Sequence, residues 1–174
     1  MVVMTWLGVY LAHTPGVRGS DNGTVLLDDE SEFQPDAALF IDPALGGQAR
    51  VENDVLVGAP ELVVEIAESS VEHDLRSKRL EYEEAGVREY VVVNLKKQRV
   101  HWFERSGDFF KPLEPEADGI LRSRVFPGLR LDPVALIGRD MARVLTVLNQ
   151  GLDQADHLAF IDRLRARSEA AETA

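Results

Sequence analysis

The chain of 174 residues contains no cysteine. This absence excludes a disulfide framework, a thiolate zinc site and a cysteine nucleophile, and it agrees with a protein of the reducing cytoplasm. No apolar run approaches the ~20 residues that a membrane-spanning helix needs, so we expect no membrane insertion. The opening residues 1–12 lack a basic leader and a cleavage motif, and we therefore expect no secretion.

Basic residues are scarce: 19 Lys and Arg stand against 30 Asp and Glu, which gives a formal net charge of −11. Proteins that neutralise many phosphates usually present a basic face, so this balance argues against tight unaided binding to DNA. A local group of cations nevertheless occurs in the middle of the chain. Its members are Arg76, Lys78, Arg79, Lys96, Lys97 and Arg99.

The length and the ordinary composition fit one globular domain. In the first third we expect a helix end at residues 5–12, two strands at 24–27 and 37–41 that form a hairpin or meander, and a loop at 43–58. The middle predicts a strand, a helix capped by Ser69 or Ser70 and ended at Gly86, and three more strands. These elements span residues 61–67, 71–85, 89–95, 99–104 and 109–113.

The C-terminal part predicts helices at residues 133–138, 142–150 and 154–168. Asp140 and Asp153 are the expected N-caps of the last two helices, and Gly151 is the expected end of the first of them. Their apolar residues favour packing on the sheet, with a homodimer contact as the alternative.

Glu65 is an acidic residue inside the apolar strand at 61–67. A carboxylate buried there without a partner costs several kcal/mol, so a compensating group is expected. Counting ~100° per residue along the next helix places Lys78 in the middle of the inward-facing stripe. Lys78 is therefore positioned to meet Glu65, although a single lysine of this kind more often extends to solvent.

Asp36 follows Pro35 at the start of the predicted strand 37–41. An aspartate there is more often a turn residue than a ligand. Together with Glu65 and Lys78, however, it makes the oxygen-rich set that Mg2+ prefers and that can polarise a phosphodiester. The competing interpretation is a buried structural ion pair between Glu65 and Lys78, without catalysis.

Four segments around these residues, in this order, resemble the Uma2 family of restriction endonuclease-like proteins, also known as DUF820, in the PD-(D/E)XK nuclease superfamily. The resemblance covers about residues 5–132, and it is carried by the segments 34–37, 58–70, 74–78 and 86–90. It implies an α/β (α+β) fold with a mixed β-sheet flanked by helices. It also implies Mg2+ or Mn2+ as cofactor, DNA as partner, and Asp36 and Glu65 as metal ligands.

The chain departs from the superfamily pattern at Ala67, where a lysine would follow the glutamate by two residues. The resemblance suggests that Lys78 takes its place. Family members usually carry a further N-terminal segment, and we expect that this chain begins inside it. Residues 1–132 would then form the restriction-endonuclease-like domain, and residues 133–174 a C-terminal helical extension packed on the same domain.

Other motifs give weaker signals. The histidines His13, His73, His101 and His157 show no spacing typical of a zinc site. The aromatic residues Trp102, Phe103, Phe109 and Phe110 could stack on bases, but such a group is more often core or oligomer surface. Two hypotheses follow: a Mg2+-dependent DNA endonuclease with Asp36, Glu65 and Lys78 at its centre, or an inactive descendant of that fold that serves as a binding or assembly module.

Overall fold

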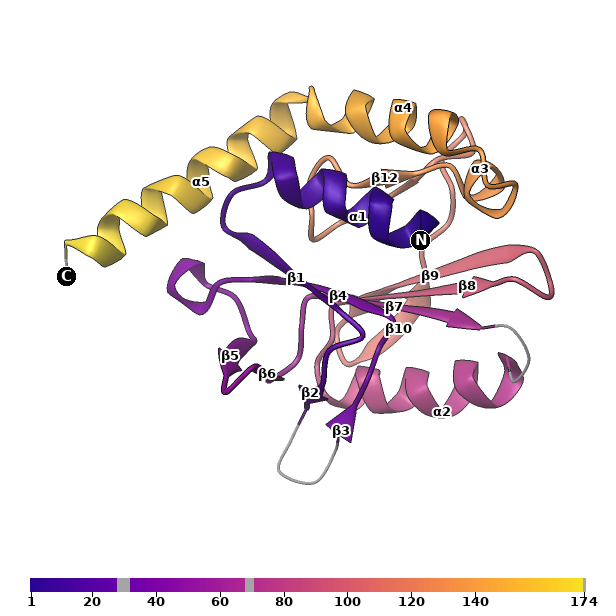
Figure 1. The fold of residues 1–174 in the computed structure, drawn as a ribbon, viewed down its shortest axis with the longest axis horizontal. Coiled ribbons are helices and arrows are strands. Elements are labelled where there is room, and N and C mark those ends of the chain that lie inside the picture. Colours follow the sequence, from indigo (N-terminus) through magenta and orange to yellow (C-terminus); the bar gives the residue numbers. More distant parts are fainter. Residues whose placement is uncertain (28–31, 68–70, 174) are drawn as a thin grey trace.

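The structure is a computed structural model that describes residues 1–27, 32–67 and 71–173, without the side chains of residues 71–75. Its elements follow one another along the chain as shown in Figure 1. They are α1 (Val2–His13), β1 (Val17–Asp21), β2 (Val25–Leu26), β3 (Glu32–Phe33), β4 (Ala37–Ile41), the 3-10 helix η1 (Pro43–Leu45), β5 (Arg50–Glu52), β6 (Val55–Val57), β7 (Leu62–Ala67), α2 (Val71–Glu84), β8 (Glu89–Asn94), β9 (Arg99–Ser106), β10 (Phe109–Pro112), β11 (Leu121–Arg122), β12 (Arg130–Leu131), α3 (Pro133–Ile137), α4 (Met141–Leu152) and α5 (Ala155–Glu172).

A six-stranded mixed sheet of order β1-β4-β7-β8-β9-β10 forms the centre of the molecule. Only β7 and β8 are parallel neighbours in this sheet, and α2 makes the crossover that a parallel pair requires. A smaller sheet of order β3-β2-β6-β5 and the pair β11-β12 complete the strands of the described residues. The mixed sheet flanked by helices confirms the expected α/β class.

Helices cover both faces of the central sheet (Figure 1). α1 and α4 lie on one face, and α2 lies on the other, beside the smaller sheet. The larger part of the core is on the α1 side, where Trp6 and Trp102 meet edge to face with ring centroids 6.0 Å apart. A smaller core under α2 is built around Tyr82 and Tyr90. In the part of the chain that the structure describes, no helix is long and apolar enough to cross a membrane.

The predicted strands and the helix of the middle region are confirmed, within one or two residues at each end. The chain leaves α2 through Gly86, whose φ of 90° is accessible to glycine at little cost, as expected for a helix-ending position. The predicted cap at Ser69 or Ser70 lies outside the described residues.

Two predictions for the first third are wrong. The strand at 24–27 does not pair with the strand at 37–41, because β2 joins the smaller sheet and β4 joins the central one. The expected loop at 43–58 contains the hairpin β5-β6, whose turn residues Asn53 and Asp54 have φ values of 50° and 64°. Asn and Asp adopt this left-handed conformation more readily than other non-glycine residues, so the pair marks a tight hairpin turn.

The C-terminal helices occur where they were predicted, with boundaries that differ by up to four residues, and the largest difference is the end of α5 at Glu172 instead of residue 168. The Asp140 side chain caps α4, accepting a hydrogen bond from the Arg143 N–H at 3.0 Å. Gly151 does not end α4, which continues to Leu152, and α5 begins after Gln154 rather than at a cap provided by Asp153. Asp153 instead ends α4, because the backbone stays in helical geometry through Gly151.

Candidate active site

Strand β7 presents Glu65 to the α2 side of the sheet. Successive side chains of a strand point to opposite faces. Val63 and Ala67 accordingly lie in the smaller core with α2, while Leu62 and Val64 lie in the larger core with α1. Glu65 shares the face of Val63 and Ala67 and is 8% exposed. A nearly buried carboxylate thus stands among small apolar side chains.

Helix α2 supplies two donors to this carboxylate. The Lys78 Nζ lies 2.8 Å from Glu65 Oε1, and the Tyr82 hydroxyl donates to the same oxygen at 2.9 Å. The predicted contact of Lys78 with Glu65 is therefore present. Tyr82 was not predicted as a site residue, yet its spacing of four residues from Lys78 places both on one face of the helix. That spacing is the signal that could have identified it.

Burial dominates the electrostatics of the pair. Loss of solvent raises the pKa of Glu65, the hydrogen bond and charge of Lys78 and the bond from Tyr82 oppose this rise, and the charge of Asp36 adds to it. Burial and the neighbouring Glu65 also raise the pKa of Tyr82. Tyr82 therefore keeps its proton and remains a hydrogen-bond donor to the carboxylate.

Asp36 stands opposite Glu65 at the edge of β4. Ala37 pairs with Val64 in the antiparallel register of β4 and β7, so the preceding residue, Asp36, faces Glu65. Its Oδ2 accepts a hydrogen bond from the Ile66 N–H at 2.6 Å. The structure therefore brings all three predicted residues, Asp36, Glu65 and Lys78, to one place on the sheet.

The donor set fits a divalent cation in charge and chemistry. Two carboxylates and one ammonium leave one negative charge, and carboxylate oxygens are the ligands of Mg2+ and Mn2+. The hydrogen bonds above use Asp36 Oδ2 and Glu65 Oε1, so the second oxygen of each carboxylate takes no part in these bonds. The described residues hold no group of three or more metal-ligating His, Cys, Asp or Glu side chains.

Glu89 is a second buried carboxylate that the sequence analysis did not single out. It is fully buried at the start of β8, and burial raises its pKa to about 7. Four donors reach it: the N–H groups of Arg124 (2.6 Å) and Val125 (3.2 Å), the Ser123 hydroxyl (2.7 Å) and the Trp102 indole (3.3 Å). These contacts tie the 123–125 segment to the sheet and give Glu89 a structural task.

Glu61 is a third such carboxylate and is also structural. It is fully buried just before β7, and its two oxygens accept from the N–H groups of Ile41 (2.9 Å) and Gln48 (3.0 Å). Each bond satisfies a backbone donor that the sheet leaves unpaired. Glu65 is therefore distinguished from Glu61 and Glu89 by its cationic partner and by the second carboxylate, Asp36, next to it.

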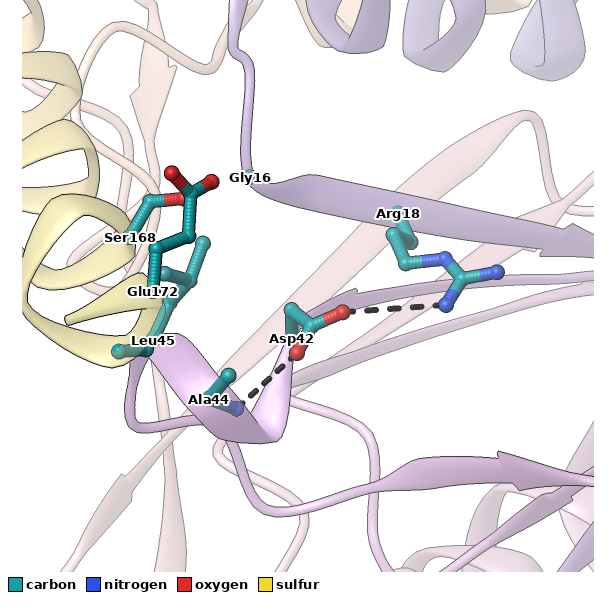
Figure 2. Close-up of a pocket in the computed structure, with 8 residues that line it drawn as sticks. Gly16, Arg18, Asp42, Ala44, Leu45, Ser168 and Glu172 are labelled. Atoms are coloured by element: carbon teal, nitrogen blue, oxygen red, sulfur yellow. Dashed lines mark hydrogen bonds and ion pairs between the residues drawn. The ribbon is translucent and has the colours of Figure 1, made fainter. Parts of the chain in front are cut away.

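A separate hollow of about 480 Å³ lies between the end of α5 and the turn η1. Figure 2 shows Asp42 in its wall, with one contact to Arg18 at 3.8 Å and another to the Ala44 N–H at 3.0 Å. Glu172 comes from α5 on the opposite wall. The polar contacts of Asp42 cap η1 and hold β1, so its role is structural. The residues that line this hollow do not include Glu65, so the hollow is distinct from the candidate active site.

Comparisons with known proteins identify the family of this chain and a solved structure of similar fold. The family model Uma2, described as "Putative restriction endonuclease", matches residues 3–134. A solved structure described as "a putative nuclease belonging to DUF820 from Anabaena variabilis ATCC 29413" is similar in fold, with a TM-score of 0.57 and 15% sequence identity, over 78% of this chain and 77% of that one. The search of curated proteins gave no match. Since the family model covers most of the chain, the chain belongs to the Uma2 family.

Proposed function

We propose that this protein is a divalent-metal-dependent endonuclease that hydrolyses phosphodiester bonds of DNA. The observation that carries the proposal is the contact of Lys78 with Glu65 at 2.8 Å beside Asp36, next to the apolar side chains of Val63 and Ala67. Membership of a family described as restriction endonucleases supports the reaction class. Restriction endonuclease-like families usually use divalent metals, and Mg2+ or Mn2+ held by Asp36 and Glu65 belongs to this proposal.

Each residue of the candidate active site has a defined task in the proposed mechanism. A bound ion would supply Lewis acidity and lower the pKa of a water nucleophile. Lys78 brings a positive charge that stabilises the negative charge developing on the phosphoryl oxygens. Tyr82, held protonated by its burial, fixes the orientation of Glu65. Asp36 is oriented in turn by the backbone of β7.

A DNA substrate and a cytoplasmic location are parts of the same proposal. The family supports DNA, and the absence of cysteine fits a reducing compartment. The net charge of −11 predicts weak binding that depends on local cations near the site.

A second candidate is an inactive nuclease fold that acts as a binding or assembly module, for example as a homodimer. Two observations favour it: the overall negative charge, and the lack of a group of three or more metal-ligating side chains in the described residues. Exposed apolar side chains on the C-terminal helices, Val134 and Leu158, offer a surface for assembly.

A cleavage assay separates the two candidates. Plasmid DNA is incubated with Mg2+ or Mn2+ and the wild type, Asp36→Asn, Glu65→Gln or Lys78→Met, with Asp162→Asn on the exposed surface of α5 as the matched control. We expect each site variant to lose cleavage by about 100-fold or more, because each removes a transition-state interaction, and the control to retain it. No metal-dependent cleavage by the wild type, together with equal metal affinity of the wild type and Asp36→Asn in calorimetry, would leave only the second candidate.

A further inference from the structure

The strand register extends the candidate site into a row across the sheet. Glu65 of β7 pairs with Val92 of β8, and Val92 pairs with His101 of β9. Asp36 faces Glu65 from the other side. Paired residues of neighbouring strands project to the same face, so Asp36, Glu65, Val92 and His101 follow one another on the α2 side of the sheet. Two strand spacings place His101 roughly 10 Å from Glu65.

His101 is a neutral polar group on this row. It is half-buried and lies over Phe103 in a stacked arrangement, with ring centroids 6.5 Å apart and an interplanar angle of 12°. Burial lowers the pKa of His101, and the positive charges of Arg99 and Lys97 lower it further. Within the described residues neither ring nitrogen makes a hydrogen bond. A neutral imidazole has one donor and one acceptor to offer a ligand.

Arg79 approaches the same place from α2. Its guanidinium carbon lies 5.4 Å from the centre of the Phe103 ring, within cation–π distance. Its Nε is buried and has no hydrogen-bond partner in the described part of the chain. Lys78 and Arg79 are consecutive, so the helix directs one toward Glu65 on β7 and the other toward Phe103 on β9. Lys78 thus lies at the Glu65 end of this row of residues, and Arg79 lies at the His101 end.

We propose that His101 and Arg79, placed on Phe103, form a nucleotide-binding subsite for the DNA strand whose scissile phosphate lies at Asp36, Glu65 and Lys78. The inference rests on the proposed function and adds a second place on the protein at which the substrate is contacted. A span of roughly 10 Å corresponds to about three nucleotides of one strand at ~3.4 Å of rise each. Arg79 binds a phosphate by charge, and His101 binds the same strand by hydrogen bonds from its ring.

The local charge supports nucleic acid as the occupant of this subsite. Arg79, Lys97 and Arg99 bring positive charge to the end of the row where His101 lies, although the chain as a whole carries a net charge of −11. A polyanion that approaches an acidic protein is attracted to such a local cationic surface. Val92, in the middle of the row, is buried beneath α2, so a bound strand contacts the two ends of the row and not its middle.

Binding can be measured without cleavage. Fluorescence anisotropy in EDTA gives the Kd of a fluorescein-labelled 16-bp DNA duplex for the wild type, Arg79→Ala, His101→Ala and His101→Phe, over a series of NaCl concentrations. His13→Ala and Arg165→Ala are the matched controls, because both residues are exposed and come from α1 and α5. His101→Phe retains an aromatic ring over Phe103 and removes only the nitrogens, so it separates hydrogen bonding from packing.

We expect the Kd to increase about five- to tenfold for Arg79→Ala and for both His101 variants, and less than about twofold for the controls. The slope of log Kd against log salt should fall by about 0.9 for Arg79→Ala, because one phosphate contact is lost. It should stay unchanged for the His101 variants, because the imidazole is neutral. Unfolding of a variant would lower its affinity without producing different salt slopes for the Arg79 and His101 variants. Arg79→Lys keeps the positive charge and should restore most of the wild-type slope.

Each outcome decides the inference separately from the proposed function. The subsite is overturned if the control variants raise the Kd as much as the Arg79 and His101 variants do. It is also overturned if the wild type does not bind the DNA duplex. The metal-dependent cleavage assay on the wild type then still decides the enzymatic activity. Binding that depends on His101 and Arg79 in a protein that never cleaves DNA would support the subsite and reject the nuclease activity.

Discussion

Lys78 is the residue on which the electrostatic balance of the candidate site depends. Its ammonium is the cation nearest to a carboxylate that is 8% exposed. Only about a third of the Lys78 side chain is exposed, so solvent screens the pair less than a surface ion pair. The stability of the fold should therefore respond to the loss of either charge, and more strongly than at the surface.

We predict that Lys78→Met lowers the free energy of unfolding at pH 8 by about 1–3 kcal/mol, because it leaves the buried Glu65 without its cationic partner and with Tyr82 as its remaining donor. The double variant Lys78→Met/Glu65→Gln should recover most of this loss. Urea unfolding of the two single variants and the double variant gives the coupling energy. As a control, Lys111→Met removes the ion pair of a more exposed lysine with Glu104, which keeps Arg124 as a partner, and should change stability by less than about 0.5 kcal/mol. Equal losses in both lysine variants would contradict the prediction.

Glu89 predicts a pH dependence of stability with a defined sign. Its folded pKa of about 7 exceeds the ordinary value of about 4.3, so between these pH values the folded state binds more protons than the unfolded state. The free energy of unfolding therefore decreases as pH rises through this range, by up to about 1.4 kcal/mol per unit for this group.

Glu89→Gln should remove this part of the dependence. We expect a shallower plot of unfolding free energy against pH between about 5 and 7 for the variant than for the wild type, measured by urea unfolding. Glu169→Gln, on the exposed part of α5, should keep the wild-type slope. Parallel plots for the wild type and Glu89→Gln would show that Glu89 titrates normally in the folded state.

The residues of the candidate site that could be predicted from the sequence are those that interrupt the apolar pattern of a strand or helix. Glu65 interrupts an apolar strand, and Lys78 interrupts the inward stripe of α2, so both were visible as exceptions. Tyr82 and His101 conform to their surroundings, and their participation follows only from the helix face and the strand register. Glu89 carries no local signal, because its four donors come largely from residues 123–125, distant in the sequence.

At the scale of elements, two helical glycines illustrate opposite constraints. A Cβ on Gly8 of α1 would meet nothing within 4 Å, whereas a Cβ on Gly151 of α4 would lie 2.1 Å from the carbonyl oxygen of Gly128. Glycine in a helix costs about 1 kcal/mol relative to alanine, so only the packing at Gly151 explains its presence. The close approach of α4 to the 126–128 turn requires it.

We predict that Gly8→Ala stabilises the protein by about 0.5–1 kcal/mol and that Gly151→Ala destabilises it by about 2 kcal/mol or more. Thermal unfolding followed by circular dichroism measures both, and each variant serves as the control for the other. A gain in stability for Gly151→Ala would mean that α4 can move away from the turn without cost.

The elements that the sequence predicted well are those whose own residues determine them. β7 and β8 are largely apolar runs bounded by turn residues, β9 follows the polar turn at residues 96–98, and α2 is followed by a glycine. The short strands β1, β3, β5, β6, β11 and β12, of two to five residues, were missed. Such strands contain too few residues for a pattern to emerge, and their pairing depends on partners elsewhere in the fold.

At the scale of the whole molecule, one core joins the two ends of the chain. Tyr10 of α1 donates to the Pro127 carbonyl at 3.0 Å, and the buried Thr14 meets the buried His157 of α5 at 3.0 Å. Leu148 of α4 and Trp102 of β9 belong to the same apolar cluster. We therefore propose that the C-terminal helical extension, residues 133–174, is part of one cooperative unit with residues 1–132.

This proposal predicts a single unfolding transition. Trp6 and Trp102 are buried beside each other, so tryptophan fluorescence reports the core, whereas far-ultraviolet circular dichroism is dominated by helices that include α4 and α5. The two signals should change at the same urea concentration. An earlier transition seen by circular dichroism alone would show that the C-terminal helices unfold independently.

The alternation of β7 gives its acidic residue a task in folding as well. If β7 slipped by one residue against its neighbours, Glu65 would turn toward the α1 side of the sheet, and Val64 or Ile66 would take its place beside Lys78. The β7 residues that face that side, Leu62 and Val64, lie in an apolar cluster. A misaligned strand would thus lose the ammonium partner and place an unpaired charge among hydrocarbon, so the carboxylate for which we propose a role in metal binding also penalises incorrect strand alignment during assembly of the sheet.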